Sequence, residues 1–438
     1  MSKINKISGF PEWLPEQKII EDNVISLIRG VYQSYGFQPI ETPSVELVST
    51  LLSKGVIDKE IYLLKRAKQE EEEASELALH FDLTVPLARY VAQHFGEITF
   101  PFKRYQLQKV WRGERPQKGR FREFYQFDID TIALEELPIS CDAEVLSAIG
   151  DVFSKLNLGN YKIRINSRKI LMGIYESFGL NKEQSSHAVS VVDKLDKIGQ
   201  NAVKAELAAG GVSENASQKI LKVAGVKIAP KDCEDGFSKL DIANQSFAQG
   251  VEEIKTLLPL LAKNALENSV IDLSLARGLD YYTGLIFEVV FEEYPEFGSV
   301  CSGGRYDNLA SQFINKKLPG VGVSIGLTRL MELIFSNAII KTEKPSLTQV
   351  LIAVYDEGQR AECNRVADLL RQAGVSTEVF YKSPKLGKQI DYAAARGIPY
   401  VLFIDKNSKA LEVKNLSTKE QVPVADLINW AETIGRTA

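Results

Sequence analysis

The stretch from Lys103 to Phe124 constrains this chain more than any other part of its sequence. It reads KRYQLQKVWRGERPQKGRFREF and holds eight Lys or Arg residues among aromatic side chains. β-Branched and aromatic residues are typical of strands, and Pro116 with Gly119 marks a loop. The stretch therefore predicts a strand, a turn and a second strand. Because the whole chain has a net charge of −4, this local cluster of cations is expected to face an anion.

The second strand continues as YQFDID and carries polar side chains at alternate positions. Because side chains alternate between the two faces of a strand, Gln126, Asp128 and Asp130 would share one face. Arg112 and Glu114 would likewise share a face of the first strand. A basic hairpin that only rests on nucleic acid or solvent is the simpler alternative, but it has no use for carboxylates and an amide. We therefore expect the two strands to wall a polar pocket.

A second cluster, LARGLDYYTG at residues 275–284, passes into the strand-like LIFEVV. Neighbouring residues on a strand point to opposite faces, so Tyr281 and Tyr282 would line one pocket only if the chain bends there. Taken alone, a pair of tyrosines is more typical of core packing. The second cluster therefore indicates a functional site only when it is considered together with the first.

Together, the two clusters resemble a known family. KVWRGERPQKGRFREFYQFDID resembles motif 2 of the class II aminoacyl-tRNA synthetases, and LARGLDYYTG resembles a signature of the histidyl-tRNA synthetases. Three further segments agree in their order along the chain: FDLTVPLARY, CSGGRYDNL, and GVGVSIGLTRL, which is similar to motif 3. The resemblance extends from about Phe10 to the C-terminus.

The resemblance implies an α/β and α+β multidomain protein. A class II catalytic core with an antiparallel sheet would occupy residues 1–180 and 267–340, and a helical insertion domain residues 181–266. An α/β anticodon-binding domain would occupy residues 346–438. The composition agrees, because aromatics nearly vanish between about 181 and 266, and the last part of the chain alternates in a βαβαββα pattern.

The segment FQPIETP, which begins at Phe37, resembles motif 1, which builds the dimer interface of class II synthetases. Its two prolines favour an edge or interface strand over a central one. The resemblance therefore implies a homodimer.

Composition excludes several other classes. The four cysteines lie far apart without a CxxC pair, and the chain has three histidines, which argues against a disulfide scaffold or a structural zinc site. The N-terminus has no apolar signal core, and no apolar run approaches membrane length. We expect a cytoplasmic protein with neither a membrane nor DNA as a partner, and with a local patch for any tRNA.

The implied reaction joins L-histidine to ATP, supplied with Mg2+, and then transfers histidine to the 3′ end of tRNA(His). In the first step a carboxylate attacks the α-phosphate, so two anions must be brought together by positioning and by positive charge. Arginine suits this role because its fork holds two oxygens at once. The resemblance assigns catalytic roles to Arg112, which would bridge the α-phosphate and the substrate carboxylate, and to Arg277, which would contact the α-phosphate. Motif 2 and motif 3 match the ATP-binding set: Arg112, Glu114, Arg120, Phe124 and Arg329.

In that set, Glu114 would accept from the adenine amino group, Phe124 would stack on the ring, and Arg120 with Arg329 would hold the outer phosphates. No metal site made of protein side chains is implied by these motifs. The ATP assignments therefore rest on three guanidinium groups, one carboxylate and one aromatic ring.

Histidine itself needs acceptors for its α-ammonium and a polar partner for each imidazole nitrogen. The family positions that match are Asp82, Leu83, Thr84, Arg112, Gln126, Asp130, Arg277, Tyr281 and Tyr282. Asp130 and Tyr282 would bind the imidazole, with the Gly303-Gly304 turn as a pocket wall. Because such a site rejects analogues that lack these polar atoms, no editing domain is expected.

The loop RPQKGR, residues 115–120, would touch the tRNA acceptor end, with Arg115 and Gln117 matched to the extra 5′ guanosine of tRNA(His). The proton acceptor of the transfer step stays open between a phosphate oxygen and a water ordered by Gln126.

Two departures from the family pattern stand out. Leu79-His80-Phe81 precedes Asp82 where an arginine is usual, and Asp130 stands where many bacterial members have Glu. We expect His80 to be a packed or solvent-facing histidine and not a ligand.

Two other protein classes remain to be weighed. One is the regulatory paralogue of ATP phosphoribosyltransferase, which shares the core but typically lacks the C-terminal domain and the motif 2 set. The other is a synthetase of the threonyl or prolyl type, which lacks LARGLDYYTG. This chain has a motif 2 set, a C-terminal α/β pattern and LARGLDYYTG, so neither of these two classes is preferred.

Overall fold

The computed structural model describes residues 5–52, 60–66, 75–276, 282–341 and 346–435. The chain separates into two compact units, Met1–Glu12 with Asn23–Ile340 and Trp13–Asp22 with Lys341–Ala438. Within the described ranges, no helix combines the length and the apolarity that a membrane span requires. The boundaries given above for a separate insertion domain, residues 181–266, remain a prediction.

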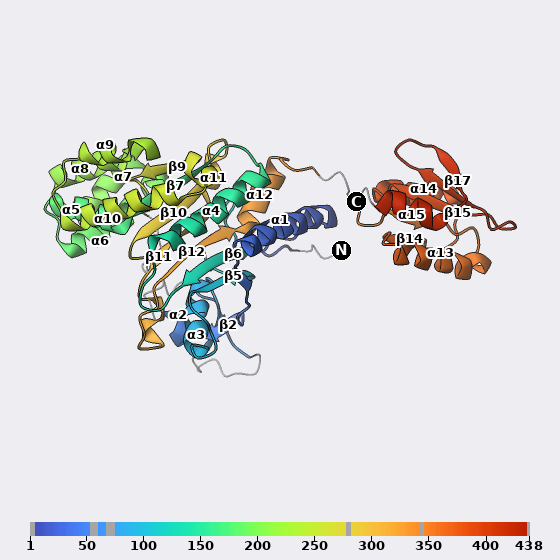
Figure 1. Cartoon of the computed structure of the whole chain (residues 1–438), viewed down its shortest axis with the longest axis horizontal. Coiled ribbons are helices and arrows are strands. Elements are labelled where there is room, and N and C mark those ends of the chain that lie inside the picture. Colours follow the sequence, from blue (N-terminus) through green and yellow to red (C-terminus); the bar gives the residue numbers. More distant parts are fainter. Residues whose placement is uncertain (1–4, 53–59, 67–74, 277–281, 342–345, 436–438) are drawn as a thin grey trace. The chain divides into compact units, whose positions relative to one another are not determined.

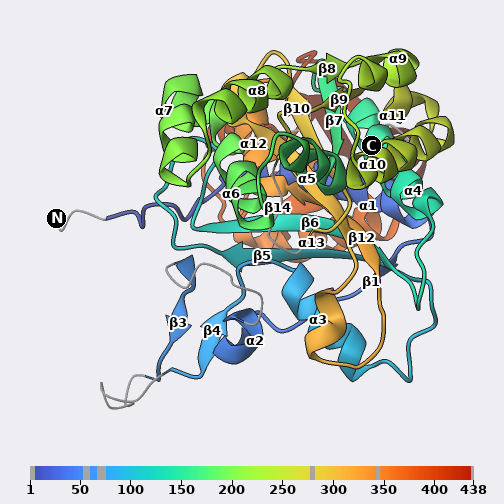
Figure 2. The same cartoon turned by 90° about the vertical axis from the view of Figure 1, so that its left-hand side faces the viewer.

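A nine-stranded sheet forms the frame of the first unit (Figure 2). The strands follow the spatial order β1 (Gln38–Pro39), β5 (Phe102–Trp111), β6 (Glu123–Ile132), β12 (Gly320–Gly326), β11 (Ser299–Tyr306), β10 (Leu285–Phe291), β7 (Tyr161–Ser167), β9 (Ser269–Asp272) and β8 (Lys227–Ile228). All neighbours pair antiparallel except β1 with β5 and β7 with β9. The predicted antiparallel core is confirmed, and Pro39 lies on an edge strand as expected.

The two faces of the sheet differ because its strands alternate in polarity. Asp128 lies opposite Gln106 of β5 and opposite Ser324 of β12, so these polar residues form a row across one face. The intervening residues, such as Phe127 and Ile129, are fully buried on the other face.

Helices cover the apolar face (Figure 1): the part of α1 (Pro15–Ser34) that begins at Asn23, α4 (Ile139–Leu156) and α12 (Leu327–Ser336). Tyr32 of α1 packs edge-on against Phe127, with ring centroids 5.1 Å apart. The polar face is thereby left for a ligand.

The β5–β6 hairpin matches the strand, turn and strand expected from the basic stretch. Its register pairs Trp111 with Glu123. The expectation that Arg112 and Glu114 lie on the first strand was wrong, because β5 ends at Trp111 and both residues follow it in the loop. The indole nitrogen of Trp111 and the ammonium of Lys109 both donate to Glu123 at this end, at 2.9 and 2.6 Å.

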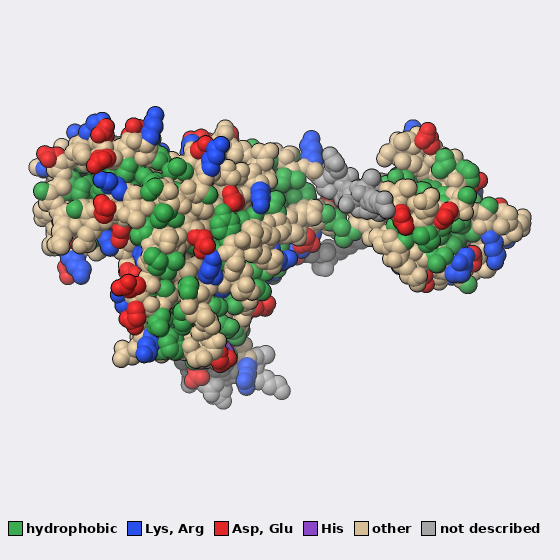
Figure 3. All heavy atoms as spheres, viewed as in Figure 1, with side chains coloured by type: hydrophobic (Ala, Val, Ile, Leu, Met, Phe, Trp, Pro, Cys, Tyr) green, Lys and Arg blue, Asp and Glu red, His purple; other side chains and the backbone are tan. Residues whose placement is uncertain are grey.

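A helical region follows β7 and fills most of the predicted insertion. Its helices are α5 (Arg168–Ser177), α6 (Lys182–Val192), α7 (Leu195–Ala209), α8 (Glu214–Ala224), α9 (Cys233–Ser238), α10 (Gln245–Leu257) and α11 (Lys263–Glu267). Asn181 and Gln184 form a reciprocal capping box at the start of α6. One short strand from this region, β8, pairs with β9 at the edge of the large sheet. On the face shown in Figure 3, acidic and basic side chains are interspersed over these helices.

A smaller sheet, β2 (Val45–Leu47), β4 (Leu77–Leu79) and β3 (Leu63–Leu64), lies beside α2 (Val48–Leu52) and α3 (Thr84–Gln93). The chain leaves β4 through His80 and enters α3 at Thr84. Trp111 donates its backbone N–H to the carbonyl of His80 at 3.0 Å, which fixes this passage against the end of β5. The start of α3 is therefore held next to the hairpin loop.

The second unit is a five-stranded sheet with helices. Its elements are β13 (Val350–Ile352), α13 (Arg360–Gln372), β14 (Thr377–Val379), α14 (Leu386–Ala395), β15 (Tyr400–Ile404), β16 (Leu411–Asn415), β17 (Gln421–Val424) and α15 (Leu427–Gly435). β13 pairs parallel with β14 and β15, and the later strands pair antiparallel. The predicted pattern is confirmed apart from β17, which was missed because it is short, mostly exposed and contains Pro423.

Candidate active site

A cavity opens on the polar face of the nine-stranded sheet, beside the β5–β6 loop. Its walls come from that loop, from β11 and β12, and from the first turn of α12. The lining residues are Arg112, Glu114, Gly119, Arg120, Phe121, Phe124, Gln126, Ser299, Val300, Cys301, Ser302, Ser324, Gly326 and Arg329. The fold therefore brings together six predicted site residues from motifs 2 and 3: Arg112, Glu114, Arg120, Phe124, Gln126 and Arg329.

Three guanidinium groups are held in place around this cavity. Arg112 donates from Nε to the carbonyl of Phe81 at 3.0 Å, and its guanidinium carbon lies 5.2 Å from the centroid of the Phe124 ring. Arg329 donates from Nε to the carbonyl of Gly119 at 2.8 Å. Arg329 also donates from Nη1 to the carbonyl of Ser299 at 2.5 Å, so backbone carbonyls hold both side chains in place.

Glu114 supplies the carboxylate among the residues that line this cavity, and it lies near two of the arginines. Arg120 donates to its Oε2 at 3.2 Å, and Nη1 of Arg112 lies 4.0 Å from its Oε1. Three guanidinium groups therefore face one carboxylate in this wall, and the excess positive charge suits a polyanion such as a triphosphate.

Asp82 lies at the entrance to α3 and is almost fully buried. Its Oδ1 accepts from the backbone N–H of Val85 at 3.1 Å, whereas no donor among the described residues reaches its Oδ2. Burial raises the pKa of Asp82 to about 6, although Val85 and Arg112 act in the opposite direction. Leu83 beside it is fully buried, and Thr84 is the half-buried first residue of α3.

The polar row of β6 holds a buried ion pair. Arg104 of β5 is fully buried, and its Nη2 lies 2.6 Å from Oδ2 of Asp130 and 3.9 Å from Oδ2 of Asp128. Burial raises the pKa of Asp130 to about 6 and that of Asp128 to about 7, and Arg104 lowers both. One guanidinium therefore serves two carboxylates.

Gln126 completes this row nearest the cavity. Its Nε2 donates to Oγ of Ser324 at 2.8 Å. Its Oε1 is buried, with no donor in hydrogen-bond range in the described part of the chain.

Two tyrosines lie beyond Asp130. The hydroxyl of Tyr306 donates to Oδ1 of Asp130 at 2.7 Å, and Tyr282 packs against the same cluster as Tyr306. The predicted Gly303-Gly304 turn was wrong, because both glycines lie inside β11. They are glycines for packing reasons: a Cβ at 303 would meet the carbonyl of Gly322 at 2.1 Å, and a Cβ at 304 would meet the Tyr282 ring at 3.0 Å.

Arg277 and Tyr281 lie outside the described residues. The segment just before them is anchored by Asn166, whose Nδ2 donates to the carbonyl of Leu275 at 2.9 Å. On the other side, Thr283 donates its backbone N–H to the carbonyl of Arg305 at 2.9 Å. Both flanks of the signature are therefore tied to the large sheet.

The predicted tRNA-contacting residues Arg115 and Gln117 are exposed on the β5–β6 loop. Gln117 also lines a cleft of 530 Å³, which has Arg120 and Arg329 in its wall as well. The loop therefore borders both the small cavity and a wider cleft.

His80 is fully buried, as the packed alternative predicted. Its Nε2 hydrogen-bonds to the carbonyl of Lys109 at 2.7 Å, and its ring lies 5.7 Å from that of Trp111. Burial lowers its pKa, so it is a neutral structural histidine.

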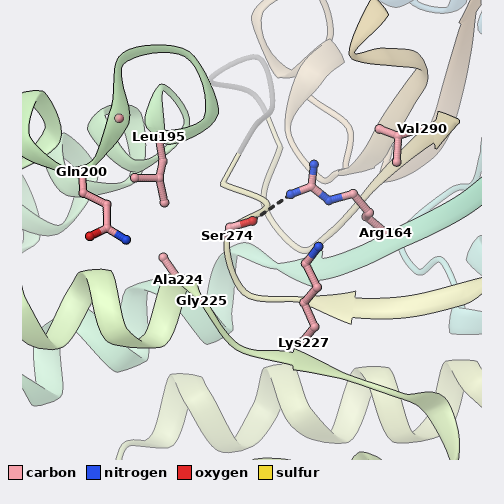
Figure 4. Close-up of a pocket in the computed structure, with 9 residues that line it drawn as sticks. Arg164, Leu195, Gln200, Ala224, Gly225, Lys227, Ser274 and Val290 are labelled. Carbon is pink, nitrogen blue, oxygen red and sulfur yellow. Dashed lines mark hydrogen bonds between the residues drawn. The ribbon is translucent and has the colours of Figure 1, made fainter. Parts of the chain in front are cut away.

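A separate cavity of 430 Å³ lies between the helical region and β7, β9 and β10 (Figure 4). Arg164 points into it and donates to Oγ of Ser274 at 2.7 Å, to Asp272 at 2.8 Å and to Glu288 at 3.3 Å. Lys227 lies 3.6 Å from the same Asp272. The two cations and two carboxylates balance, so this wall is a structural ion-pair network.

Sequence reasoning missed Arg104 and Tyr306 and gave Asp128 no role. The alternation in KRYQLQK could have placed Arg104 on the face of Gln106 and Gln108. Tyr306 lay within the quoted segment CSGGRYDNL, but its contact with Asp130 depends on pairing between distant strands. No local signal reports that pairing.

Comparisons with known proteins agree with this geometry. A family model described as Histidyl-tRNA synthetase matches residues 9–330, and one described as Anticodon binding domain matches residues 349–434. The chain is 44% identical over 428 residues to the histidine--tRNA ligase of Thermobifida fusca, covering 97% of each chain. It is 41% identical to the histidine--tRNA ligase of Clostridium tetani, over 95% of this chain and 94% of that one. The crystal structure of a histidyl-tRNA synthetase from Nostoc superposes with a TM-score of 0.86 at 37% identity and covers all of both chains.

Proposed function

Because this chain belongs to the histidyl-tRNA synthetase family, we propose that it activates L-histidine with ATP to histidyl-adenylate and pyrophosphate, and then transfers histidine to the 3′ end of tRNA(His). The observation that carries this proposal is one polar region of the sheet, made of the cavity and the polar residues next to it. Anchored guanidinium groups line its outer part, and buried acceptors lie in its inner part. An anion and an ammonium can therefore be bound side by side.

In the outer part, Arg112 would bind the α-phosphate together with the substrate carboxylate. Phe124 would stack on the adenine, Glu114 would accept from its amino group, and Arg120 with Arg329 would hold the outer phosphates. Mg2+ would arrive with ATP, since this ion is usually held by substrate phosphates and one or two carboxylates. The chain's own contribution is to orient the two anions and to neutralise their repulsion.

In the inner part, Asp82, Thr84 and Gln126 would accept from the α-ammonium. Asp130 and Tyr282 would recognise the imidazole. The ion pair with Arg104 and the hydrogen bond from Tyr306 support this assignment, because they fix the Asp130 carboxylate in one orientation. A polar site of this kind discriminates strongly against analogues that lack the matching atoms.

Pyrophosphate exchange with each of the twenty amino acids tests the proposed function. We expect exchange with histidine alone, and loss of that exchange when Arg277 is replaced by Ala or His. Exchange that depends on threonine or proline instead would overturn the proposal.

Arg115 and Gln117 would contact the acceptor end of tRNA(His), because both are exposed on the loop that borders the site. Replacing each by alanine is expected to lower kcat/KM for charging by about 10-fold, the usual cost of losing a charged or polar contact. Histidine-dependent exchange without tRNA should stay unchanged. A tRNA(His) that lacks its extra 5′ nucleotide should be charged equally poorly by both variants and by the parent enzyme, and an additive loss would contradict the assignment.

A homodimer is also proposed, with the β2–β4–β3 sheet in its interface. Leu47 and Leu77 lie opposite each other on one face of that sheet, and they are 50% and 43% exposed. An apolar pair of this kind is stabilised when a second copy covers it. A cytoplasmic location stays a prediction from the sequence.

Replacing Leu47 and Leu77 together by glutamate should convert the dimer to monomer. Each leucine removed from a buried interface costs about 1.5–3 kcal/mol, so the dissociation constant should rise at least about 100-fold. Light scattering after gel filtration measures the mass. Leu260→Glu is the matched control, because Leu260 is 49% exposed on the helical region. A double variant that remains dimeric would show that the interface lies elsewhere.

A further inference from the structure

Asp128 lies at the centre of the polar row on β6, between Gln126 and Asp130. Its Cα partner on β12 is Ser324, which lines the cavity, as Gln126 does. It is 2% exposed. The carboxylate therefore lies on the polar face of the sheet, next to two residues of the cavity wall.

Asp128 is less closely paired than its neighbour Asp130. Arg104 lies 2.6 Å from Asp130 but 3.9 Å from Asp128, so of the two ion pairs the one with Asp128 is the weaker. Over the described ranges, no hydrogen-bond donor reaches Oδ1 of Asp128. Ser324 hydrogen-bonds to the carboxylate, but a buried oxygen atom that lacks a donor still costs free energy.

Groups on four parts of the chain shift the pKa of Asp128. They are Arg104 on β5, Asp130 on β6, Asp82 before α3 and Ser324 on β12. Burial, Asp130 and Asp82 raise the pKa of Asp128 to about 7, whereas Arg104 and Ser324 lower it. An additional cation placed here would stabilise both Asp82 and Asp128 in their charged forms.

Three acceptor atoms in this part of the site lack a donor from the described residues: Oδ2 of Asp82, Oε1 of Gln126 and Oδ1 of Asp128. A primary ammonium carries three N–H donors. Asp130, in contrast, is engaged by both Arg104 and Tyr306. The free acceptors therefore fit an ammonium better than an imidazole.

We propose that Asp128 is a further substrate-binding residue, and that its Oδ1 accepts one N–H of the histidine α-ammonium alongside Asp82 and Gln126. This inference rests on the proposed function and adds a residue to it. It assigns Asp128 to the ammonium and leaves the imidazole to Asp130 and Tyr282.

The test compares two ligands that differ only in the ammonium group, histidinol and 3-(imidazol-4-yl)propan-1-ol, on the parent enzyme and on Asp128→Asn. Isothermal titration calorimetry on the full chain measures both affinities. We expect Asp128→Asn to weaken histidinol about 10- to 100-fold, as for a charge-assisted hydrogen bond, and to leave the deaminated ligand within about 2-fold. Equal losses for both ligands, or no loss for either, would overturn the inference.

Two further measurements keep the test decisive. Asp128→Ser removes the carboxylate with a smaller side chain and should reproduce the selective loss if Asp128→Asn folds poorly. Asp391→Asn, an exposed aspartate on α14, is the control for the chemical change. If the parent enzyme exchanges pyrophosphate with histidine but both Asp128 variants bind histidinol normally, the inference fails while the proposed function stands. If the parent enzyme shows no histidine-dependent exchange, both fail.

Discussion

Replacing Arg112 by lysine is expected to lower histidine-dependent pyrophosphate exchange by about 100- to 1000-fold, the usual loss when a preorganised group that stabilises transition-state charge is removed. Arg112 fixes its Nε on the carbonyl of Phe81 and rests on Phe124, so its fork is preorganised for two oxygens. Lysine offers a point charge on a flexible stem and cannot reproduce the fork. The initial rate of exchange, measured at saturating ATP and histidine, gives the effect on the chemical step.

The matched control for this substitution is Arg396→Lys, at an exposed arginine directly after α14. It should exchange at the parent rate. Arg112→Lys should also unfold at nearly the parent temperature, because Arg112 is only partly buried. An Arg112→Lys enzyme that keeps more than about a tenth of the parent rate would remove Arg112 from the catalytic role.

Replacing Arg104 by methionine should destabilise the first unit by about 3–5 kcal/mol at pH 8, since removing one partner of a buried pair leaves an uncompensated charge. Here two carboxylates lose their shared cation, because Arg104 serves both Asp130 and Asp128. Urea unfolding of the parent and variant at pH 5, 6.5 and 8 measures the free energy of unfolding.

The loss should shrink as the pH falls. The folded-state pKa values of Asp128 and Asp130 are already raised to about 7 and 6, and losing Arg104 raises them further. An acid with a raised folded pKa favours the folded state when protonated, and that advantage is lost as the pH rises through the folded pKa. The variant should therefore be least impaired at pH 5 and most impaired at pH 8.

A triple variant provides the control for Arg104→Met. Adding Asp128→Asn and Asp130→Asn removes both charges, so most of the stability at pH 8 should return. A loss of stability that does not change between pH 5 and pH 8 would mean that Arg104 contributes packing and not charge.

Features that depend on alternation along one strand could be predicted from the sequence. Contacts between strands that lie far apart in the chain could not. The β5–β6 hairpin and the shared face of Gln126, Asp128 and Asp130 followed from the period of two along one strand. Pairing of Arg104 with Asp130 depends on the register between two strands, and contact between Tyr306 and Asp130 depends on strands far apart in the chain. Alternation within one strand cannot specify these partners.

The Gly303-Gly304 pair shows a second limit. Adjacent glycines are typical of turns, yet here they let neighbouring strands and the Tyr282 ring approach closely. Steric crowding across a sheet depends on tertiary structure, so the local sequence wrongly predicted a turn at these two glycines.

The strand β8 has a mechanical consequence for the helical region. Through β8, two residues of that region, Lys227 and Ile228, are paired with Asp272 and Ile271 of β9, and the N–H of Leu273 adds a bond to the carbonyl of Val226. The helices could rotate freely about a linker only if these backbone hydrogen bonds were broken. A change in the orientation of the helices would instead displace β9 and the backbone that follows it up to residue 276. A force on the helical region would therefore be transmitted to the edge of the large sheet.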